Sequence, residues 1–349
     1  MQDDSRARVI KALNWDDGEM GELNMSVTNP TVSLSEVKKR GRGRVPNFLR
    51  VMKKYWVFYL MMLPAIIILI INNYIPMLGT VIAFKDINYQ KGILGSDWVG
   101  FSNFKYLFST ETAWIITRNT LLYNTAFIVL TLIFSLAFAI MFNEMRSRWL
   151  SKFHQSAMFL PYFLSWVVVS YLVYGFLSAE HGFMNKTLLP FFGVDPIEWY
   201  SQSQYWPGIL VIVKLWKEIG YTTVIYMAAI IGIDHEYYEA ALIDGASKWK
   251  QIRKITLPLI SPVIIVMTLL QIGRIFNADF GLFFQVTRNA GALYSTTQVI
   301  DTYVYQTFLA IGDIGMSSAA GLVQSVVGFL LIFLANLAVR RISKDDALF

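Results

Sequence analysis

Long apolar runs separated by short polar segments dominate this chain from residue 56 onward. We place six of them, at residues 56–83, 115–142, 156–177, 207–232, 262–285 and 315–339. Each exceeds about 18 residues, which is long enough for a helix to cross the hydrocarbon of a bilayer. The chain lacks the alternating segments of about ten residues that lipid-facing strands show. The pattern therefore predicts an all-α integral membrane protein with six transmembrane helices.

Two further features qualify this division of the chain. Residues 1–54 are polar and lack the apolar core of a signal peptide, so we expect a cytosolic N-terminal extension followed by a membrane domain over residues 55–349. The stretch 4–15 has the pattern of a short amphipathic helix, although a mobile extension is the simpler interpretation. The first span contains Asn72, Asn73 and Pro76, which predict a bend or unwinding at its far end.

Lysine and arginine fall unevenly between the loops on alternate sides of the spans. The segments before span one, after spans two and four, and after span six hold most of the basic residues, including a patch at residues 38–44. Because Lys and Arg accumulate on the cytoplasmic side of membrane proteins, both termini are predicted to be cytoplasmic.

Composition supports a membrane protein and argues against other classes. Of 349 residues, 55% are hydrophobic and 15% charged, against roughly 25% charged in soluble domains. The net charge of +6 comes from residues beside the spans, so it does not indicate nucleic-acid binding. The absence of cysteine excludes disulfides and thiolate chemistry. The three histidines lie far apart in different loops, which argues against a histidine metal site.

The loop before span five is unusually ordered. Residues 236–243 are good helix formers, and Gly245 is suited to end that helix in a left-handed conformation. Residues 246–255 predict a second helix that stops before Pro258. Two short helices joined by a glycine form a stiff connector with one face available to a soluble partner.

The connector also has a recognisable spacing. Glu239-Ala240-Ala241 is followed after three residues by Gly245, and after nine more by Ile255-x-Leu257-Pro258. This spacing resembles the EAA loop of binding-protein-dependent ABC importer permeases. The resemblance implies the type I, sugar-permease-like architecture, with residues 233–261 as the coupling loop that sits in a cleft of an ATPase subunit. The implied coupling residues are Glu239, Ala240, Ala241, Asp244, Gly245, Leu257 and Pro258. An amphipathic connector resting on lipid headgroups is the alternative.

Other stretches are similar to the sugar-transporting branch of that family. These are residues 98–104, 216–220, 289–294 and 299–305, the last two resembling permeases for oligosaccharides or polysaccharide fragments. The resemblance implies a bacterial plasma-membrane protein that works with a second, homologous permease as a heterodimer, two ATPase subunits, an extracellular solute-binding protein and a saccharide. No glycine-rich phosphate loop ending in Gly-Lys-Ser/Thr is present, so ATP and magnesium are assigned to the partner ATPase and this chain is predicted to bind no cofactor and to be no enzyme.

Polar residues inside spans are costly and indicate a transport path. In span five we select Gln271, Arg274, Asn277 and Asp279, with Gln271 and Arg274 on one helical face at i, i+3. In span four we select Trp216 and Tyr221, because aromatic faces suit the C–H patches of sugars. Alternatively, the charged side chains snorkel or form internal ion pairs that hold helices together, and the aromatic residues anchor span ends. The charged residues concerned are Lys214, Lys217, Glu218 and Arg274.

Three rival functions remain open. An ABC permease for another solute shares every coupling feature. An ion-coupled secondary transporter with Glu218, Asp279 and Arg274 as a relay leaves the EAA spacing unexplained. For a membrane-bound enzyme, the sequence shows no converging set of catalytic residues.

Overall fold

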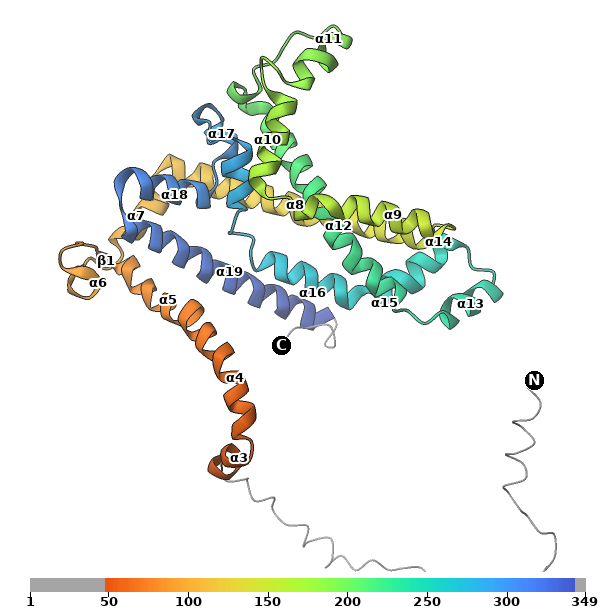
Figure 1. Cartoon of the computed structure of the whole chain (residues 1–349), viewed down its shortest axis with the longest axis horizontal. Helices are drawn as coiled ribbons and strands as arrows, with labels where there is room; N and C mark the ends of the chain where they lie inside the picture. Colours follow the sequence, from red (N-terminus) through yellow and green to blue (C-terminus); the bar gives the residue numbers. More distant parts are fainter. Residues whose placement is uncertain (1–47, 343–349) are drawn as a thin grey trace, which may run out of the picture. The chain divides into compact units, whose positions relative to one another are not determined.

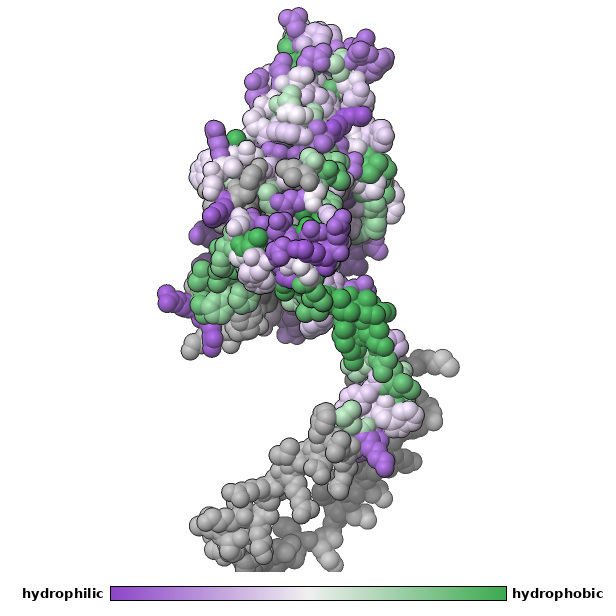
Figure 2. Space-filling model, turned by 90° about the vertical axis from the view of Figure 1, so that its left-hand side faces the viewer, coloured by the Kyte–Doolittle hydropathy of each residue, from purple (hydrophilic) through white to green (hydrophobic). Residues whose placement is uncertain are grey.

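The computed structural model describes residues 48–342, and the chain divides into two compact units at residues 68 and 69. The predicted amphipathic helix at 4–15 and the basic patch at 38–44 lie outside the described residues. The first unit holds the short helix α3 (Phe48–Lys54) and most of α4 (Trp56–Leu69). No residue of α4 is buried, and Figure 2 shows this helix as a hydrophobic column.

The bend predicted in the first span is a local rewinding of the helix. After α4 the chain continues as a π-helical turn over Ile70–Tyr74, then α5 (Ile75–Leu78) and a 3-10 turn over Gly79–Phe84. The N–H of Ile75 bonds to the carbonyl of Ile70, one residue further than in an α-helix. Pro76 then falls in the first turn of α5, where a missing N–H is tolerated.

Five helices of the second unit run side by side as a bundle (Figure 1). They are α8 (Glu111–Glu144), α9 (Arg148–Phe159), α12 (Trp206–Ile231), α16 (Ser261–Ile272) and α19 (Ile314–Ile342). Thr110 caps the start of α8 by accepting a hydrogen bond from the N–H of Ala113. Tyr226 and Ile230 of α12 are buried with Ala139 of α8 in one core cluster, so the two helices are packed along their length.

The shorter elements gather at the two ends of this bundle (Figure 1). One end carries α13 (Glu236–Ile243), α14 (Lys248–Gln251) and α15 (Leu257–Leu259). The other carries α6 (Gly92–Gly95), α7 (Ser102–Ser109), α17 (Tyr294–Thr297), α18 (Ile300–Ile311) and a small antiparallel hairpin of β1 (Lys85–Asp86) with β2 (Asp97–Trp98). Helix α10 (Trp166–Leu177) stands across the bundle and leads to α11 (Leu189–Phe191).

Three described helices are long and apolar enough to cross a membrane, at Trp56–Phe84, Glu111–Glu144 and Ile314–Arg341. Two bent pairs raise that number to five if each pair is one span. The predicted span 207–232 is present as α12, but Lys214, Lys217 and Glu218 in its middle exclude it from this set. The count of six spans stays a prediction.

The third predicted span is not one straight helix. Helix α9 ends at Phe159, a 3-10 turn follows over Leu160–Phe163, and α10 leaves at an angle of 102°. Pro161 stands in the 3-10 turn, and Ser165 starts α10 as its N-cap, accepting from the N–H of Val168. Proline and an N-cap serine together end one helix and begin another, which the apolar run alone does not reveal.

The fifth predicted span is also interrupted, so the prediction of a continuous helix over 262–285 was wrong. Helix α16 ends at Ile272, residues 273–279 are irregular, and a π-helical turn covers Gly281–Val286. Gln271 and Arg274 therefore do not share a helical face, because Arg274 lies in the turn after the helix. Side chains from three other helices bond to the freed backbone, as described below.

Candidate functional site

The predicted helix–glycine–helix connector is confirmed in its first arm. Helix α13 covers Glu236–Ile243, and Gly245 has a left-handed φ of +70°. The N–H of Ala246 bonds to the carbonyl of Ala241 at 2.9 Å, and that of Gly245 bonds to Leu242 at 3.0 Å. This pair of bonds is the Schellman ending, which satisfies the last carbonyls of a helix and favours glycine at the left-handed position.

The second arm starts later and runs further than predicted. Ser247 caps α14, a π-helical turn covers Ile252–Thr256, and α15 continues to Leu259, past Pro258. The prediction that the helix stops before the proline was wrong. In the π turn the N–H of Leu257 bonds to the carbonyl of Ile252, so the hydrogen-bond ladder has shifted by one residue just before Pro258.

One side-chain contact joins the connector to the bundle, and two others hold the connector together. Lys248 forms an ion pair of 2.9 Å with Glu144 at the end of α8. Within the connector, the Tyr238 hydroxyl lies 2.9 Å from the Thr256 hydroxyl, which joins the two arms. The buried Gln251 donates to the carbonyl of Ala246 at 3.1 Å. The connector is therefore joined to α8 by the ion pair and to α16 by the chain, which continues from α15 into α16.

The connector presents an exposed face. Of the seven predicted coupling residues, Glu239, Ala240, Asp244, Gly245 and Pro258 are exposed, whereas Ala241 and Leu257 are half-buried. Leu242 and Ile243 are also exposed, Ile243 at 86%. Adjacent apolar side chains and a carboxylate on a short rigid helix suit docking into a protein cleft.

The irregular residues 273–279 form a second candidate site. Asn124 of α8 donates to the carbonyl of Ile275 at 2.8 Å, and Gln324 of α19 donates to that of Phe276 at 2.7 Å. Asp301 of α18 accepts from the N–H of Ala278 at 2.7 Å. Non-helical backbone within a membrane protein is tolerated where protein buries it or where it lines a water-filled cavity. We call this stretch the unwound segment.

Asp301 is a partly buried carboxylate at the unwound segment. Burial raises the pKa of its carboxyl, and the bond from Ala278 opposes that rise. Its Oδ2 also accepts from Gln324 at 3.2 Å. The roles of Asn124 and Gln324 were missed from the sequence, and Asp301 was noted only within a family motif. A polar side chain inside spans two and six is the signal that points to them.

Replacing Asp301 tests how firmly the unwound segment is held. Asp301→Leu leaves the N–H of Ala278 without its acceptor and the Gln324 amide with Phe276 as its remaining acceptor, and we expect it to cost about 1–3 kcal/mol of stability. Asp301→Asn keeps an acceptor and is expected to cost less. The melting temperature of the purified transporter reports both. Equal losses in the two variants contradict the proposed hydrogen bond.

A charged cluster joins α12 to the unwound segment. The Lys214 ammonium lies 2.5 Å from Glu218 and 2.8 Å from Asp279. Its side chain is 14% exposed and also lies over the rings of Phe127 and Trp166. One cation thus neutralises part of the charge of two carboxylates on two different segments.

A pair of stacked tyrosines lies on the same face of α12. Tyr221 stacks on Tyr162 with ring centroids 4.6 Å apart, and both rings are partly exposed. The buried Lys217 donates to the Tyr162 carbonyl at 2.9 Å and lies over the rings of Tyr162 and Trp166. Lys217 has no carboxylate within ion-pair distance in the described part of the chain.

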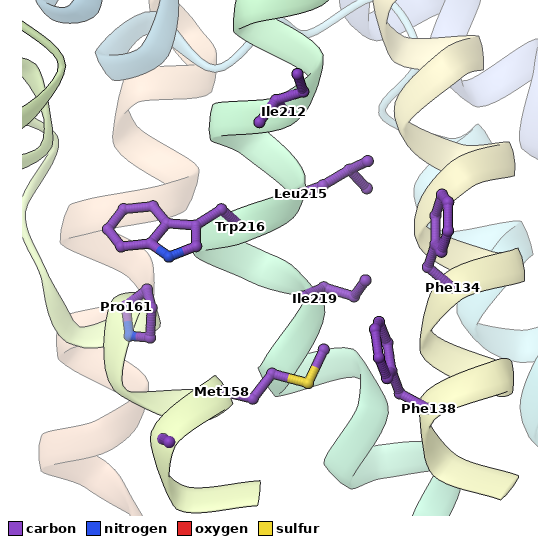
Figure 3. Close-up of a pocket in the computed structure, with 9 residues that line it drawn as sticks. Phe134, Phe138, Met158, Pro161, Ile212, Leu215, Trp216 and Ile219 are labelled. Atoms are coloured by element: carbon purple, nitrogen blue, oxygen red, sulfur yellow. The ribbon is translucent and has the colours of Figure 1, made fainter. Parts of the chain in front are cut away.

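The remaining predicted path residues are placed differently. Arg274 and Asn277 are exposed on the unwound segment, and Gln271 is half-buried at the end of α16. Arg274 forms no ion pair with any residue between 48 and 342. Trp216 lies about 200° around α12 from Lys214. With Pro161 and Met158 it lines an apolar hollow of about 390 Å³. Figure 3 shows these side chains around the hollow.

Comparison with known proteins places this chain in a family. Residues 131–344 match the binding-protein-dependent transport system inner membrane component. The polygalacturonan/rhamnogalacturonan transport system permease protein YteP of Bacillus subtilis is 34% identical, over 90% of this chain and 97% of that relative.

Two solved structures share the fold. A bacterial ABC transporter involved in the import of the acidic polysaccharide alginate matches with a TM-score of 0.78 and 33% identity, over 84% of this chain and 99% of that one. The bacterial alginate transporter in complex with an alginate pentasaccharide-bound periplasmic protein matches at 0.77 and 33%, over 85% and 98%. The resemblance seen in the EAA spacing is confirmed. The chain therefore belongs to the family of binding-protein-dependent transport system inner membrane components, as a multi-pass membrane permease of the ABC transporter class.

Proposed function

We propose that this chain is a permease subunit of an ATP-driven importer that moves an oligosaccharide or polysaccharide fragment from an extracellular binding protein into the cytoplasm. The observation that carries this proposal is the connector around Gly245. It exposes Glu239, Leu242 and Ile243, while Lys248 pairs with Glu144 of α8 and Gln251 bonds to Ala246 within the connector itself. A rigid element with an exposed docking face is what a permease needs to follow a separate ATPase.

The saccharide class is supported by the relatives. The permease YteP is named for polygalacturonan and rhamnogalacturonan, and the structural neighbour imports alginate, an acidic polysaccharide. In this chain Arg274 and Lys217 are cations without a carboxylate partner among residues 48–342. We therefore favour a fragment that carries carboxylates. An ABC permease for a different solute is the second candidate, and stimulation by that solute in place of a saccharide identifies it.

The mechanism we propose is a shift between two states of the assembled transporter. ATP binding draws two partner ATPase subunits together, and the connector passes this movement to α8 and α16. The unwound segment follows α16 directly, and the charged cluster of α12 is joined to it through Asp279. There the path opens to one side of the membrane or the other. Saccharide and nucleotide act by their different affinities for the two states, and no chemistry takes place on the sugar.

The assembly implied by this function has four kinds of component. The chain pairs with a second, homologous permease as a heterodimer, and two ATPase subunits hold ATP and magnesium. An extracellular binding protein delivers the saccharide. The permease lies in the bacterial plasma membrane with six spans and both termini in the cytoplasm.

A substitution at Gly245 tests the coupling role. Gly245→Val places a β-branched residue at φ +70°, and this strain costs roughly 1–2 kcal/mol. We expect the variant to insert and assemble but to lose saccharide-stimulated ATP hydrolysis. Gly245→Asn is the matched control, because asparagine tolerates the left-handed region. Normal stimulation in the valine variant argues against coupling through this turn.

Ion-coupled secondary transport is the rival from another class. Its relay needs Glu218, Asp279 and Arg274 to exchange protons. The two carboxylates pair with Lys214, and Arg274 pairs with neither of them. Uptake into vesicles that continues with an inactivated ATPase, but stops when the proton gradient is dissipated, identifies the rival.

A further inference from the structure

A second hollow lies on the α18 and α19 side of the unwound segment. It measures about 380 Å³, within the range of small-molecule sites. Its lining includes Asp301, Tyr305 and Phe308 from α18, Gly321 and Gln324 from α19, and Phe280 from the end of the unwound segment. None of these residues belongs to the charged cluster of α12.

The floor of this hollow carries acceptor oxygens. The Oδ2 of Asp301 accepts hydrogen bonds from the N–H of Ala278 and from the Gln324 amide. The Nε2 of Gln324 donates to the carbonyl of Phe276 and to Asp301. The Oδ1 of Asp301 and the Oε1 of Gln324 accept no hydrogen bond from another described residue. No buried side-chain oxygen or nitrogen lacks a partner within the described part of the chain, so these two oxygens keep some accessible surface, and both residues line the hollow. They are available to hydroxyl donors.

The wall of the hollow is aromatic and rigid. Phe280 meets Tyr305 edge to face with ring centroids 4.9 Å apart, and Phe284 behind them lies 4.8 Å from Phe280 and 5.2 Å from Tyr305. Tyr305 is 37% exposed and Phe308 40%. Their free faces offer apolar surface beside the acceptor oxygens.

The acceptor oxygens of the floor and the aromatic wall together favour one class of ligand. A carboxylate facing hydrocarbon is costly, so a lipid chain fits this hollow poorly. A nucleotide phosphate, or any anion that lacks hydroxyl donors, does not suit a floor made of acceptors. A sugar ring has an apolar C–H face for the aromatic wall and hydroxyl donors for Asp301 and Gln324.

We propose that the hollow formed by Asp301, Tyr305, Phe308, Gly321 and Gln324 is a subsite for one sugar unit of the transported glycan, bound through its hydroxyl groups. This rests on the proposed function as a saccharide permease. The Asp301 carboxylate repels a carboxylate on the bound unit, so a uronate is bound with its acid group pointing away from Asp301. Asp301 and Gln324 also bond to the backbone of the unwound segment. A sugar bound in this subsite therefore contacts the two side chains that hold that backbone in place.

Site-specific labelling tests the subsite, because the chain has no cysteine of its own. Gly321→Cys puts a thiol on the wall, where an added Cβ meets no atom within 4 Å. Leu309→Cys, on α18 and 63% exposed but outside the lining, is the matched control. Both are built into the complete transporter and labelled with a maleimide, with and without oligogalacturonides presented on the binding protein.

We expect the saccharide to slow labelling of Gly321→Cys about tenfold at ten times its Kd, as occupancy requires, and to leave Leu309→Cys unchanged. Phe308→Ala in the Gly321→Cys background is expected to remove the protection. Equal labelling with and without saccharide overturns the subsite, provided that saccharide still stimulates ATP hydrolysis in the same sample. Slow labelling without saccharide, restored when the subunit is isolated, shows that a partner subunit covers the hollow and also overturns it. If no saccharide stimulates hydrolysis even in the wild type, the proposed function itself fails.

Discussion

Replacing Lys214 by alanine is expected to destabilise the subunit and to abolish transport. The change leaves Glu218 and Asp279 close together without the cation that lies 2.5 and 2.8 Å from them. Breaking a fully buried pair costs about 3–5 kcal/mol. Because the Glu218 side chain is 35% exposed, we expect about 2–3 kcal/mol here. The melting temperature of the assembled transporter and its saccharide-stimulated ATPase activity measure the two effects.

A triple variant controls for lost packing. Lys214→Met, Glu218→Gln and Asp279→Asn together keep similar volumes and remove all three charges. The single variant for comparison is Lys214→Met, which has the same volume at position 214 but leaves the two carboxylates without their cation. If electrostatics dominates, the triple variant is more stable than this single variant. A triple variant that melts at or below the temperature of the single variant contradicts the electrostatic account.

Replacing Gly220 by alanine is expected to force α9 away from α12. A Cβ at this position overlaps the backbone carbonyl of Met158 and lies 2.8 Å from the Cα of Phe159. These are backbone atoms that cannot rotate aside, so we expect the overpacking to cost about 1–3 kcal/mol. The stacked pair of Tyr162 and Tyr221 lies next to this contact, so saccharide-stimulated hydrolysis falls as well.

Gly208 on the same helix provides the control. A Cβ there meets no atom within 4 Å, and alanine favours a helix over glycine by about 1 kcal/mol. Gly208→Ala is therefore expected to leave the melting temperature unchanged or raised, while Gly220→Ala lowers it. A similar effect of the two substitutions contradicts the close contact of α9 and α12.

The sequence predicted those parts of the fold that depend on local signals. The bounds of α12 and of α13 follow from apolar length and helix formers, and the left-handed turn at Gly245 follows from the freedom of glycine. These features need no partner elsewhere in the chain. The family spacing around Glu239 then supplied the expected role, which stays a proposal.

The breaks within apolar runs could not be predicted in the same way. At 273–279 the helix ends because Asn124, Asp301 and Gln324, distant in sequence, bond to its backbone. No window of the sequence contains that arrangement. The turn at Pro161 had a local signal, but a proline inside an apolar run also fits a kinked helix, so the 102° angle depends on packing.

The residues chosen for the path lie in different surroundings, and their role in transport stays a prediction. Asp279 lies in the charged cluster and Tyr221 in the stack of tyrosines on the same face of α12. Trp216 was chosen for its aromatic character, yet its position on the helix turns it to the other side, into the apolar hollow. Tyr221 is seven positions from Lys214 and shares its helical face, whereas Trp216 is two positions away and lies on the other side. The helical face on which a residue lies therefore matters more than its residue type.

The central claim is that the connector around Gly245 couples this permease to a separate ATPase. The most direct measurement is ATP hydrolysis by the complete transporter, reconstituted with its second permease, ATPase and binding protein, with and without oligogalacturonides. The wild type is compared with a Glu239→Ala, Gly245→Val double variant that still assembles. Saccharide is expected to stimulate hydrolysis in the wild type and not in the double variant. Equal stimulation in both would contradict the account.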